Sequence, residues 1–232
     1  MPEASTPHRD ALPLLEARGL AAVHGASYVL LDLDLRVEAG ERVAIAGANG
    51  AGKSTLLSLL AGQNAPHDGE LRWRGTDVRD LDPRQLQRRV GWLGHQPGLL
   101  MALSARENLL MFAELAGCDA SPARIDAVLD AVGLDAADRR RPVATYSRGM
   151  TQRAGLGRLM AVGAALWLLD EPTTGLDADG VTRLERALTF HQRRGGAIVV
   201  VTHDQTQWQA ADRLLWLEQG RLRTQSAPKA AA

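Results

Sequence analysis

The segment GANGAGKST, residues 47–55, has the residue types and spacing of a loop that wraps phosphate groups. Its glycines let successive backbone N–H groups turn toward an anion, and a helix that follows adds favourable partial charge. In this pattern Lys53 reaches the β- and γ-phosphates of a nucleotide, Ser54 binds Mg²⁺ and Thr55 supports the α-phosphate end. The other predicted nucleotide-binding residues are Gly47, Ala48, Asn49, Gly50, Ala51 and Gly52. A glycine-rich turn without a ligand is the structural alternative, but the flanking strand and helix are the context that phosphate binding requires.

The apolar run ALWLLDE, residues 165–171, ends in two carboxylates. Buried strands of α/β sheets present ligand residues at their carboxyl ends. We expect Asp170 to lie on the Mg²⁺ side and Glu171 to be the catalytic base that orients the attacking water. A strand that merely surfaces into polar residues is the alternative, which the phosphate-binding loop in the same chain disfavours.

Two more polar residues follow predicted strands. His203 comes at the end of VVVTHD, and Gln96 directly follows RVGWLGH. If the sheet is parallel, these strand ends open toward one crevice with Asp170. We therefore expect His203 to contact the γ-phosphate region and Gln96 to position Mg²⁺ or water. The alternatives are a structural hydrogen-bonding histidine and a polar turn residue before Pro97.

The stretch YSRGMTQR, residues 146–153, begins a predicted helix and can be either a cap or half of a site. As an N-cap, Ser147 is worth about 1 kcal/mol, and Thr, Asp or Asn would serve as well. A cap does not explain Gly149, because glycine inside a helix costs about 1 kcal/mol relative to alanine. A phosphate near the helix start explains both residues, since a hydroxyl and uncovered N–H groups then face an anion.

Strands and helices alternate around these motifs. Residues 14–37 alternate apolar and polar positions, which predicts antiparallel strands. Further strands are expected at RVAIAG, ELRWRG, RVGWLGH, ALWLLD, AIVVV and RLLWLEQG, and helices at KSTLLSLLAG, 148–160, 180–193 and briefly from Asp204. The pattern predicts an α/β fold with a mostly parallel sheet and a separate antiparallel part.

A run of helices interrupts this alternation. SARENLLMFAELAG starts with a capping box from Ser104 to Glu107, and SPARIDAVLDAVGL has Ser121 as a cap and Pro122 at the first helical position. We expect a helical subdomain over residues 96–148. The whole domain is expected to span 14–222, between disordered tails at 1–13 and 223–232.

Composition excludes several classes of protein. The 27 basic and 27 acidic residues cancel, so no global field recruits nucleic acid or anionic lipid. The single cysteine, Cys118, cannot form an internal disulfide and favours a reducing compartment. The longest apolar run, LMAVGAALWLL, is about half of the ~20 residues that a membrane span needs. We expect a soluble protein without a signal peptide, which can still dock on a membrane protein.

The order of GANGAGKST, Gln96, YSRGMTQR, LWLLDE, TGLD (174–177) and THD resembles the nucleotide-binding subunit of an ABC transporter. The resemblance covers roughly residues 14–222 and implies a P-loop NTPase core of ABC type that hydrolyses ATP with Mg²⁺. It also implies a homodimer that forms head to tail on ATP binding. Ser147 and Gly149 would then touch the γ-phosphate of ATP held by the partner's Lys53, and Asp177 would belong to the loop that communicates across the dimer.

The same resemblance implies a membrane partner. Integral permease subunits would place a coupling helix near residues 96–100, and the chain would lie peripherally on the cytoplasmic face of the bacterial inner membrane. No nucleic acid is expected as a partner.

The chain departs from the family pattern at two places. Tyr146, Arg148 and Met150 replace the Leu, first Gly and Gln of the usual LSGGQ signature. The aromatic residue that usually stacks on adenine is replaced by His24, with Tyr28 as a second candidate.

The stretch LGHQPGLLMALSARENL, residues 93–109, resembles the haem-exporter ATPase of bacterial cytochrome c maturation. Haem export is therefore the expected function, although haem itself would not touch this chain. The alternatives are the ATPase of another ABC exporter, such as a multidrug type, a soluble ABC ATPase of iron–sulfur assembly, and a nucleotide-dependent interaction module without turnover. The presence of Glu171 argues against the last of these.

Overall fold

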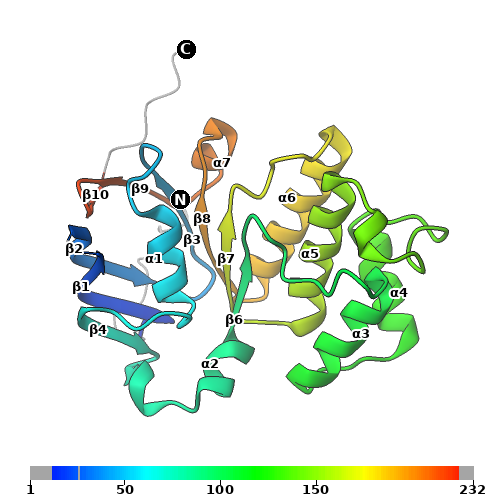
Figure 1. Ribbon diagram of the computed structural model, residues 1–232, viewed down its shortest axis with the longest axis horizontal. Helices are drawn as coiled ribbons and strands as arrows, with labels where there is room; N and C mark the ends of the chain where they lie inside the picture. Colours follow the sequence, from blue (N-terminus) through cyan, green and yellow to red (C-terminus); the bar gives the residue numbers. More distant parts are fainter. Residues whose placement is uncertain (1–11, 26, 225–232) are drawn as a thin grey trace, which may run out of the picture.

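The computed structural model describes residues 12–25 and 27–224, which form two β-sheets with helices packed around them (Figure 1). The larger sheet has the strand order β10-β9-β3-β8-β7-β6. Its strands are β3 (Arg42–Ala46), β6 (Val90–Leu93), β7 (Leu166–Asp170), β8 (Ala197–Val201), β9 (Arg213–Glu218) and β10 (Arg221–Thr224). All neighbouring pairs in it are parallel except the β9–β10 hairpin. The prediction of a mostly parallel sheet is confirmed.

The smaller sheet is antiparallel, as the alternation over residues 14–37 predicted. Its order is β2-β1-β4-β5. The strands are β1 (Leu15–His24), β2 (Ser27–Val37), β4 (Asp68–Trp73) and β5 (Thr76–Asp77).

Helices cover both faces of the larger sheet. They are α1 (Lys53–Leu60), α2 (Pro83–Arg89), α3 (Ala105–Ala116), α4 (Pro122–Ala131), α5 (Arg148–Val162), α6 (Ala178–Arg193) and α7 (Gln205–Gln209), with short 3₁₀ turns at Val78–Asp80 and Val143–Thr145. The capping box from Ser104 to Glu107 is present as predicted. Ser121 lies at the N-cap of α4, but its hydroxyl donates to Asp119 and does not cap the helix.

Strand alternation divides the hydrophobic core in two. Val43 and Ile45 of β3 pack into a core shared with α1 and the antiparallel sheet, whereas Ala44 and Ala46 face a core made with α3, α4, α5 and α6. Successive side chains of a strand point to opposite faces, so one short buried strand serves both cores. The antiparallel and helical subdomains therefore flank the sheet from its two sides (Figure 1).

The predicted domain limits and tails lie partly outside the described residues. Residues 1–11 and 225–232 are not described. Within the described range, β10 continues to Thr224 and pairs with β9, so the segment from 223 begins as a strand and not as a tail. β10 and α2 were not predicted, because RLRT and PRQLQRR carry too few apolar residues to show a clear period.

Candidate functional site

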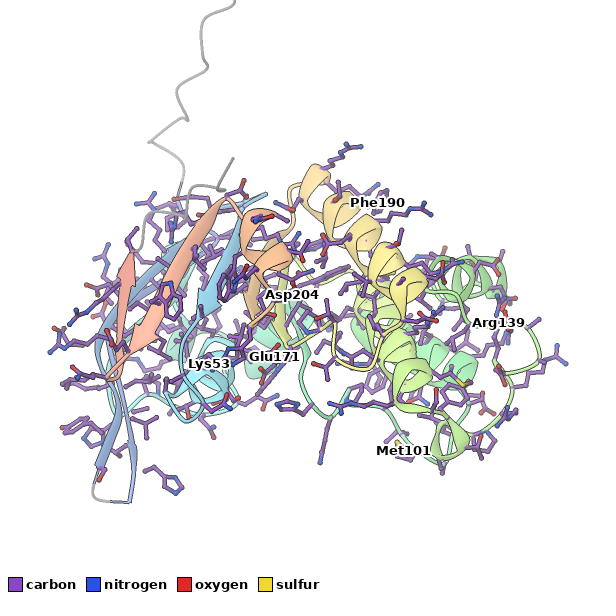
Figure 2. The ribbon with its side chains drawn as sticks, turned by 90° about the horizontal axis from the view of Figure 1, so that it is seen from above. Lys53, Met101, Arg139, Glu171, Phe190 and Asp204 are labelled. Carbon is purple, nitrogen blue, oxygen red and sulfur yellow. The ribbon has the colours of Figure 1, made fainter. Side chains whose placement is uncertain are left out.

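The carboxyl ends of β3, β7 and β8 meet at one edge of the larger sheet. β8 lies between the other two strands and pairs in parallel with both, with Val201 opposite Ile45 on one side and Asp170 on the other. Figure 2 shows Lys53, the first residue of the helix α1 that follows β3, and Glu171, directly after β7, at this edge. The convergence predicted for the three strand ends is present.

The backbone of residues 47–53 requires glycine at both ends of the loop. Gly47 has φ 154°, and a Cβ there would lie 2.4 Å from the carbonyl oxygen of Leu217. Gly52 has φ 99°, and its Cβ would lie 2.9 Å from Cγ1 of Val29. Ala48, Asn49 and Gly50 between them are exposed, and Ala51 is half-buried. No side chain caps α1 and no acid lies in its first turn. The helix start is therefore open to an anion.

The Lys53 ammonium lies above this loop. Its Nζ donates to the carbonyl oxygens of Gly47 at 2.7 Å and Ala48 at 2.9 Å, and lies 3.4 Å from Nε2 of His203. Among the ion pairs of the described residues, none involves Lys53. The cation is thus held in place without a carboxylate that would neutralise it, which suits a group that binds phosphate.

Ser54 and Asp170 supply hard oxygen ligands. The Ser54 hydroxyl donates to Oδ2 of Asp170 at 2.9 Å, and Asp170 is only 5% exposed. Within the described part of the chain, no cluster of three or more His, Cys, Asp or Glu could hold a metal alone. Mg²⁺ fits such a site, because it prefers oxygen and usually keeps waters and substrate phosphates beside one or two protein ligands.

Glu171 is held by the segment that follows β8. Its backbone has φ 48°, a left-handed value that non-glycine residues adopt seldom. Oε2 accepts from the Thr202 hydroxyl at 3.2 Å and from the His203 N–H at 3.4 Å. Oε1 is buried without a hydrogen-bond partner and lies 3.7 Å from Nε2 of His203. A carboxylate oriented in this way, with one oxygen unsatisfied, can accept a proton from a water molecule.

Thr202 was not singled out from the sequence. It is fully buried, yet its hydroxyl fixes the candidate base. Its position in VVVTHD, directly before His203, is the sequence feature that could have indicated it.

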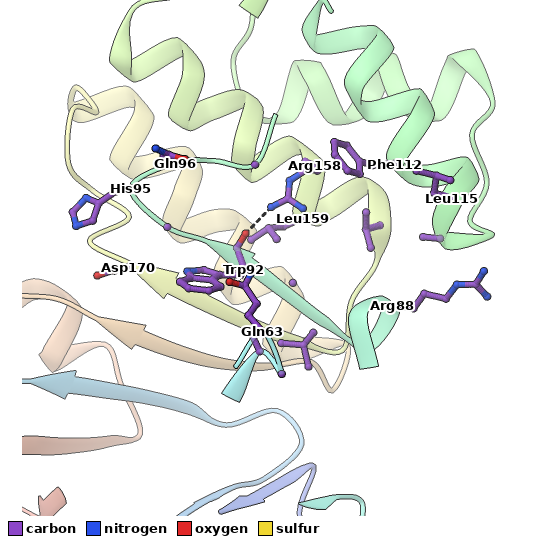
Figure 3. A pocket seen from close by; sticks show the side chains of 18 of the residues that line it. Gln63, Arg88, Trp92, His95, Gln96, Phe112, Leu115, Arg158, Leu159 and Asp170 are labelled. Atoms are coloured by element: carbon purple, nitrogen blue, oxygen red, sulfur yellow. Dashed lines mark hydrogen bonds between the residues drawn. The ribbon is translucent and has the colours of Figure 1, made fainter. Parts of the chain in front are cut away.

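Gln96 lies on the wall of a cleft between α1 and the helical subdomain (Figure 3). The cleft has a volume of about 1070 Å³ and is lined by Ser54, Asp170 and Gln96 at one end and by Trp92, Phe112 and Leu115 along its length. The Gln96 side chain is exposed. It therefore shares an open space with both Mg²⁺ candidates.

The β1–β2 hairpin places His24 and Tyr28 on different faces. His24 pairs with Ser27, and Val23 pairs with Tyr28. Val29, two residues after Ser27, contacts the phosphate-binding loop at Gly52. The pairing is irregular between Ala22 and Val23, opposite Val29, so strand alternation does not place His24 relative to the loop, and its contact with adenine stays a prediction. Tyr28 is 58% exposed and packs edge-on against His67, with the two ring centroids 5.9 Å apart.

At the start of α5, the structure gives local reasons for both Ser147 and Gly149. Ser147 is an exposed N-cap whose hydroxyl accepts from the Met150 N–H at 3.3 Å. A Cβ on Gly149 would lie 2.7 Å from the carbonyl oxygen of Gly175. Gly149 therefore also has a structural reason, because the close approach of residue 175 already excludes a side chain, and the phosphate contact stays a prediction.

Asp177 caps α6 and ties it to α5. Its carboxylate accepts from the Gly180 N–H at 2.8 Å and pairs with Arg153 at 2.6 Å. These two donors lower the pKa of Asp177 below its ordinary value. Arg153 also pairs with Asp179 at 3.2 Å. Arg153, the last residue of YSRGMTQR, was not predicted to act and joins the start of α5 to the segment around residue 177.

The unusual signature residues have their own contacts. The Tyr146 hydroxyl donates to the carbonyl oxygen of Asp138 at 2.7 Å, and burial raises the pKa of Tyr146. Tyr146 and Arg148 line a hollow of about 210 Å³ together with Asp170 and Glu171. The start of α5 thus borders the strand-end carboxylates of its own chain.

Comparisons with known proteins agree with this geometry. A family model described as ABC transporter matches residues 30–174. The cytochrome c biogenesis ATP-binding export protein CcmA of Cupriavidus necator is 43% identical over 192 residues, which cover 83% of this chain and 84% of the relative.

Two solved structures show the same fold. An ATP-binding subunit of an ABC transporter has a TM-score of 0.84 at 28% identity, covering 92% of this chain and 90% of its own. A dimeric ATP-binding cassette in a post-hydrolysis state, bound to ADP and Pi, has a TM-score of 0.83 at 25% identity, covering 92% and 99%.

None of the helices in the described residues combines the length and apolarity needed to cross a membrane.

Proposed function

The chain belongs to the ABC transporter family as an ATP-hydrolysing subunit, and we propose that it drives a separate membrane permease that exports haem for cytochrome c biogenesis. The observation that carries the catalytic part is the placement of Glu171. Its carboxylate is fixed by Thr202 and His203 beside the Lys53 loop and the Ser54–Asp170 pair.

In the proposed reaction, the N–H groups of residues 47–55 and the Lys53 ammonium bind the β- and γ-phosphates. Glu171 accepts a proton from the water that attacks the γ-phosphorus, the bond to the bridging oxygen breaks, and ADP and phosphate leave. His203 donates to a γ-phosphate oxygen. Ser54, Asp170 and Gln96 would hold Mg²⁺, which neutralises phosphate charge when bound. His24 would stack on the adenine from the hairpin.

A second copy of the chain completes the site in this proposal. Ser147 is exposed and Gly149 is partly exposed at the open start of α5, where a hydroxyl and free N–H groups can face an anion. Each would bind the γ-phosphate held by the partner's Lys53, and Asp177 would lie at the dimer contact. The solved relative bound to ADP and Pi is a dimer, which supports this arrangement.

The permease would dock at the cleft beside Gln96. Leu100 and Met101 are 49% and 50% exposed next to it, and Phe112 and Leu115 line its apolar length. An apolar helix from a membrane subunit suits such a groove. Docking there would place the chain peripherally on the cytoplasmic face of the inner membrane.

The substrate assignment rests on the relatives. Curated proteins at 42–43% identity are cytochrome c biogenesis ATP-binding export proteins. Haem is the cargo that the permease would carry, and the ATPase would not bind it.

Copurification tests the proposed partner. The tagged chain is isolated from detergent-solubilised membranes, and the integral proteins that accompany it are identified. We expect permease subunits of a haem exporter. Multidrug-type permeases would replace the haem assignment, and soluble iron–sulfur assembly proteins would replace the transporter role.

A paired variant makes the docking test specific. Leu100→Ser with Met101→Ser is expected to release the permease. Phe190→Ser is the matched control, because Phe190 is 59% exposed and lies on the opposite side of the molecule from Met101 (Figure 2). Equal loss of the permease in both variants would contradict docking at the cleft.

A further inference from the structure

Arg158 holds the segment that carries Gln96 from both sides. It lies on α5, and its Nη2 donates to the carbonyl oxygen of Trp92 at 2.6 Å (Figure 3). Its Nε donates to the carbonyl oxygen of Pro97 at 3.2 Å. The two hydrogen bonds lie on either side of residues 93–96, so the guanidinium fastens this segment to helix α5.

Other contacts keep the guanidinium in one orientation. Its Cζ lies 5.2 Å from the centroid of the Phe112 ring, which belongs to α3. Gly98 has φ 66°, and a Cβ there would lie 3.3 Å from Nη2 of Arg158. The segment from Gly94 to Gly98 therefore has flexible glycines at its ends and one planar group against which it is set.

The interaction is not an ion pair. None of the ion pairs found among residues 12–25 and 27–224 involves Arg158. Burial lowers the pKa of Arg158, because no carboxylate offsets the desolvation of the cation. A charged group is normally buried only with partners that satisfy its donors. Here the partners are two backbone carbonyls five residues apart, which accept from two different nitrogens of one planar guanidinium, Nη2 and Nε; a lysine ammonium has a single nitrogen and cannot reproduce this geometry.

We propose that Arg158 is a positioning residue that couples the start of α5 to Gln96. Arg158 lies on the same rigid helix as Ser147 and Gly149. Arg158 ties the backbone on both sides of Gln96 to this helix, in β6 at Trp92 and in the following segment at Pro97, and so sets where Gln96 lies relative to Ser54 and Asp170. This inference rests on the proposed function, because Gln96 acts only if the cleft end is the Mg²⁺ and water site.

The test is the Mg²⁺ dependence and the kcat-against-KM split of the ATPase. Arg158→Lys keeps the charge but replaces the planar fork by a single ammonium nitrogen, and Arg158→Met removes the charge and every donor. We expect kcat to fall about tenfold or more and the Mg²⁺ concentration for half-maximal rate to rise in Arg158→Met, with a smaller change of both in Arg158→Lys. The KM for ATP should stay within about twofold, because the residues of the phosphate-binding loop are untouched.

Arg124→Met is the matched control. Arg124 also donates to backbone carbonyls on α5, those of Ala161 at 3.0 Å and Met160 at 3.4 Å, but none of its hydrogen bonds among the described residues reaches the segment that carries Gln96. It should lower thermal stability without moving the Mg²⁺ dependence. If Arg158→Lys and Arg124→Met change the ATPase alike, Arg158 is only structural and the inference is overturned.

A double-mutant cycle shows whether Arg158 acts through Gln96. In a Gln96→Ala background, Arg158→Met should change kcat by less than about twofold, because the group that it positions is gone. If the fold-reductions of kcat in the two single variants multiply in the double variant, the inference is overturned while the ATPase assignment stays intact. A parent protein without ATPase activity would instead remove the proposed function and this inference together.

Discussion

The carboxyl edge of the sheet and the start of α5 differ in how many contacts their candidate residues make with one another. At the sheet edge the candidate groups contact each other: Lys53 lies 3.4 Å from His203, and His203 lies 3.7 Å from Glu171. At the start of α5, the hydrogen bonds found for Ser147 among the described residues stay within its own helix, and Gly149 makes room for Gly175. One region is an assembled set of interacting side chains, and the other is an exposed helix start.

This difference shows what a single chain can complete. The loop, the base and the histidine need no second molecule to be brought together. The hydrogen bond from the Met150 N–H explains Ser147 as a helix cap, and the approach of Gly175 explains Gly149. Neither contact accounts for the exposure of the start of α5. We infer that the first region binds and hydrolyses nucleotide, and that the second serves a nucleotide held by another copy.

Removing the base at the sheet edge has the largest expected effect. Glu171→Gln keeps the size of the side chain and can still accept from Thr202 and His203, but it cannot take up a proton. We expect kcat to fall by about 10²- to 10⁴-fold, with ATP still bound and a stable dimer by size-exclusion chromatography. ATP hydrolysis at the parent rate would show that Glu171 is not the base.

Mixing two inactive variants tests directly whether the sheet edge and the start of α5 form one shared site. Lys53→Ala disables the sheet edge, and Ser147→Arg blocks the start of α5. In a head-to-tail dimer each pure variant lacks both sites, whereas the mixed dimer has one intact site. Equimolar mixing should restore about a quarter of the parent ATPase rate. If Ser147→Arg alone hydrolyses ATP normally, or if mixing restores nothing, the two regions do not form a shared site.

Restoring LSGGQ tests the residues that depart from the family. Tyr146→Leu, Arg148→Gly and Met150→Gln together leave Ser147 and Gly149 in place. Loss of the Tyr146–Asp138 hydrogen bond should lower the free energy of unfolding by about 1 kcal/mol. The ATPase rate should change by less than about threefold, because the phosphate-facing residues are retained. A larger gain in rate would mean that the native residues restrain the enzyme.

The smallest expected effect is a pH dependence at the junction between α5 and α6. The Gly180 N–H and Arg153 lower the folded-state pKa of Asp177. The carboxylate therefore stabilises the fold above its ordinary pKa of about 4, and this contribution is lost as the pH falls through the lower folded value. Asp177→Asn should flatten the fall in unfolding free energy between about pH 5 and 3, measured by urea denaturation.

Asp135→Asn is the control for this titration, since Asp135 is exposed. An equal flattening in both variants would show that Asp177 has no special part in the acid response.

Much of the site follows from the sequence because its chemistry depends on local spacing. GANGAGKST must form a loop between a strand and a helix, and ALWLLDE must end a buried strand in two acids. These patterns need only the chain direction and the strand period to place Lys53, Ser54, Asp170 and Glu171. The parallel sheet, and hence the shared edge, follows from the alternation of strands and helices.

Contacts between distant segments were decided only by the tertiary structure. Thr202 orients Glu171 across 31 residues of sequence, and Arg158 reaches Trp92 across 66. Neither residue type has a local pattern that marks it, because its partner is a carboxylate or a carbonyl oxygen brought near by folding. The same holds for Gly149, whose need for a bare backbone comes from Gly175. The sequence determined which groups can do the chemistry, whereas the pairing of β7 with β8 and the packing of α5 against the sheet determined which residues hold them in place.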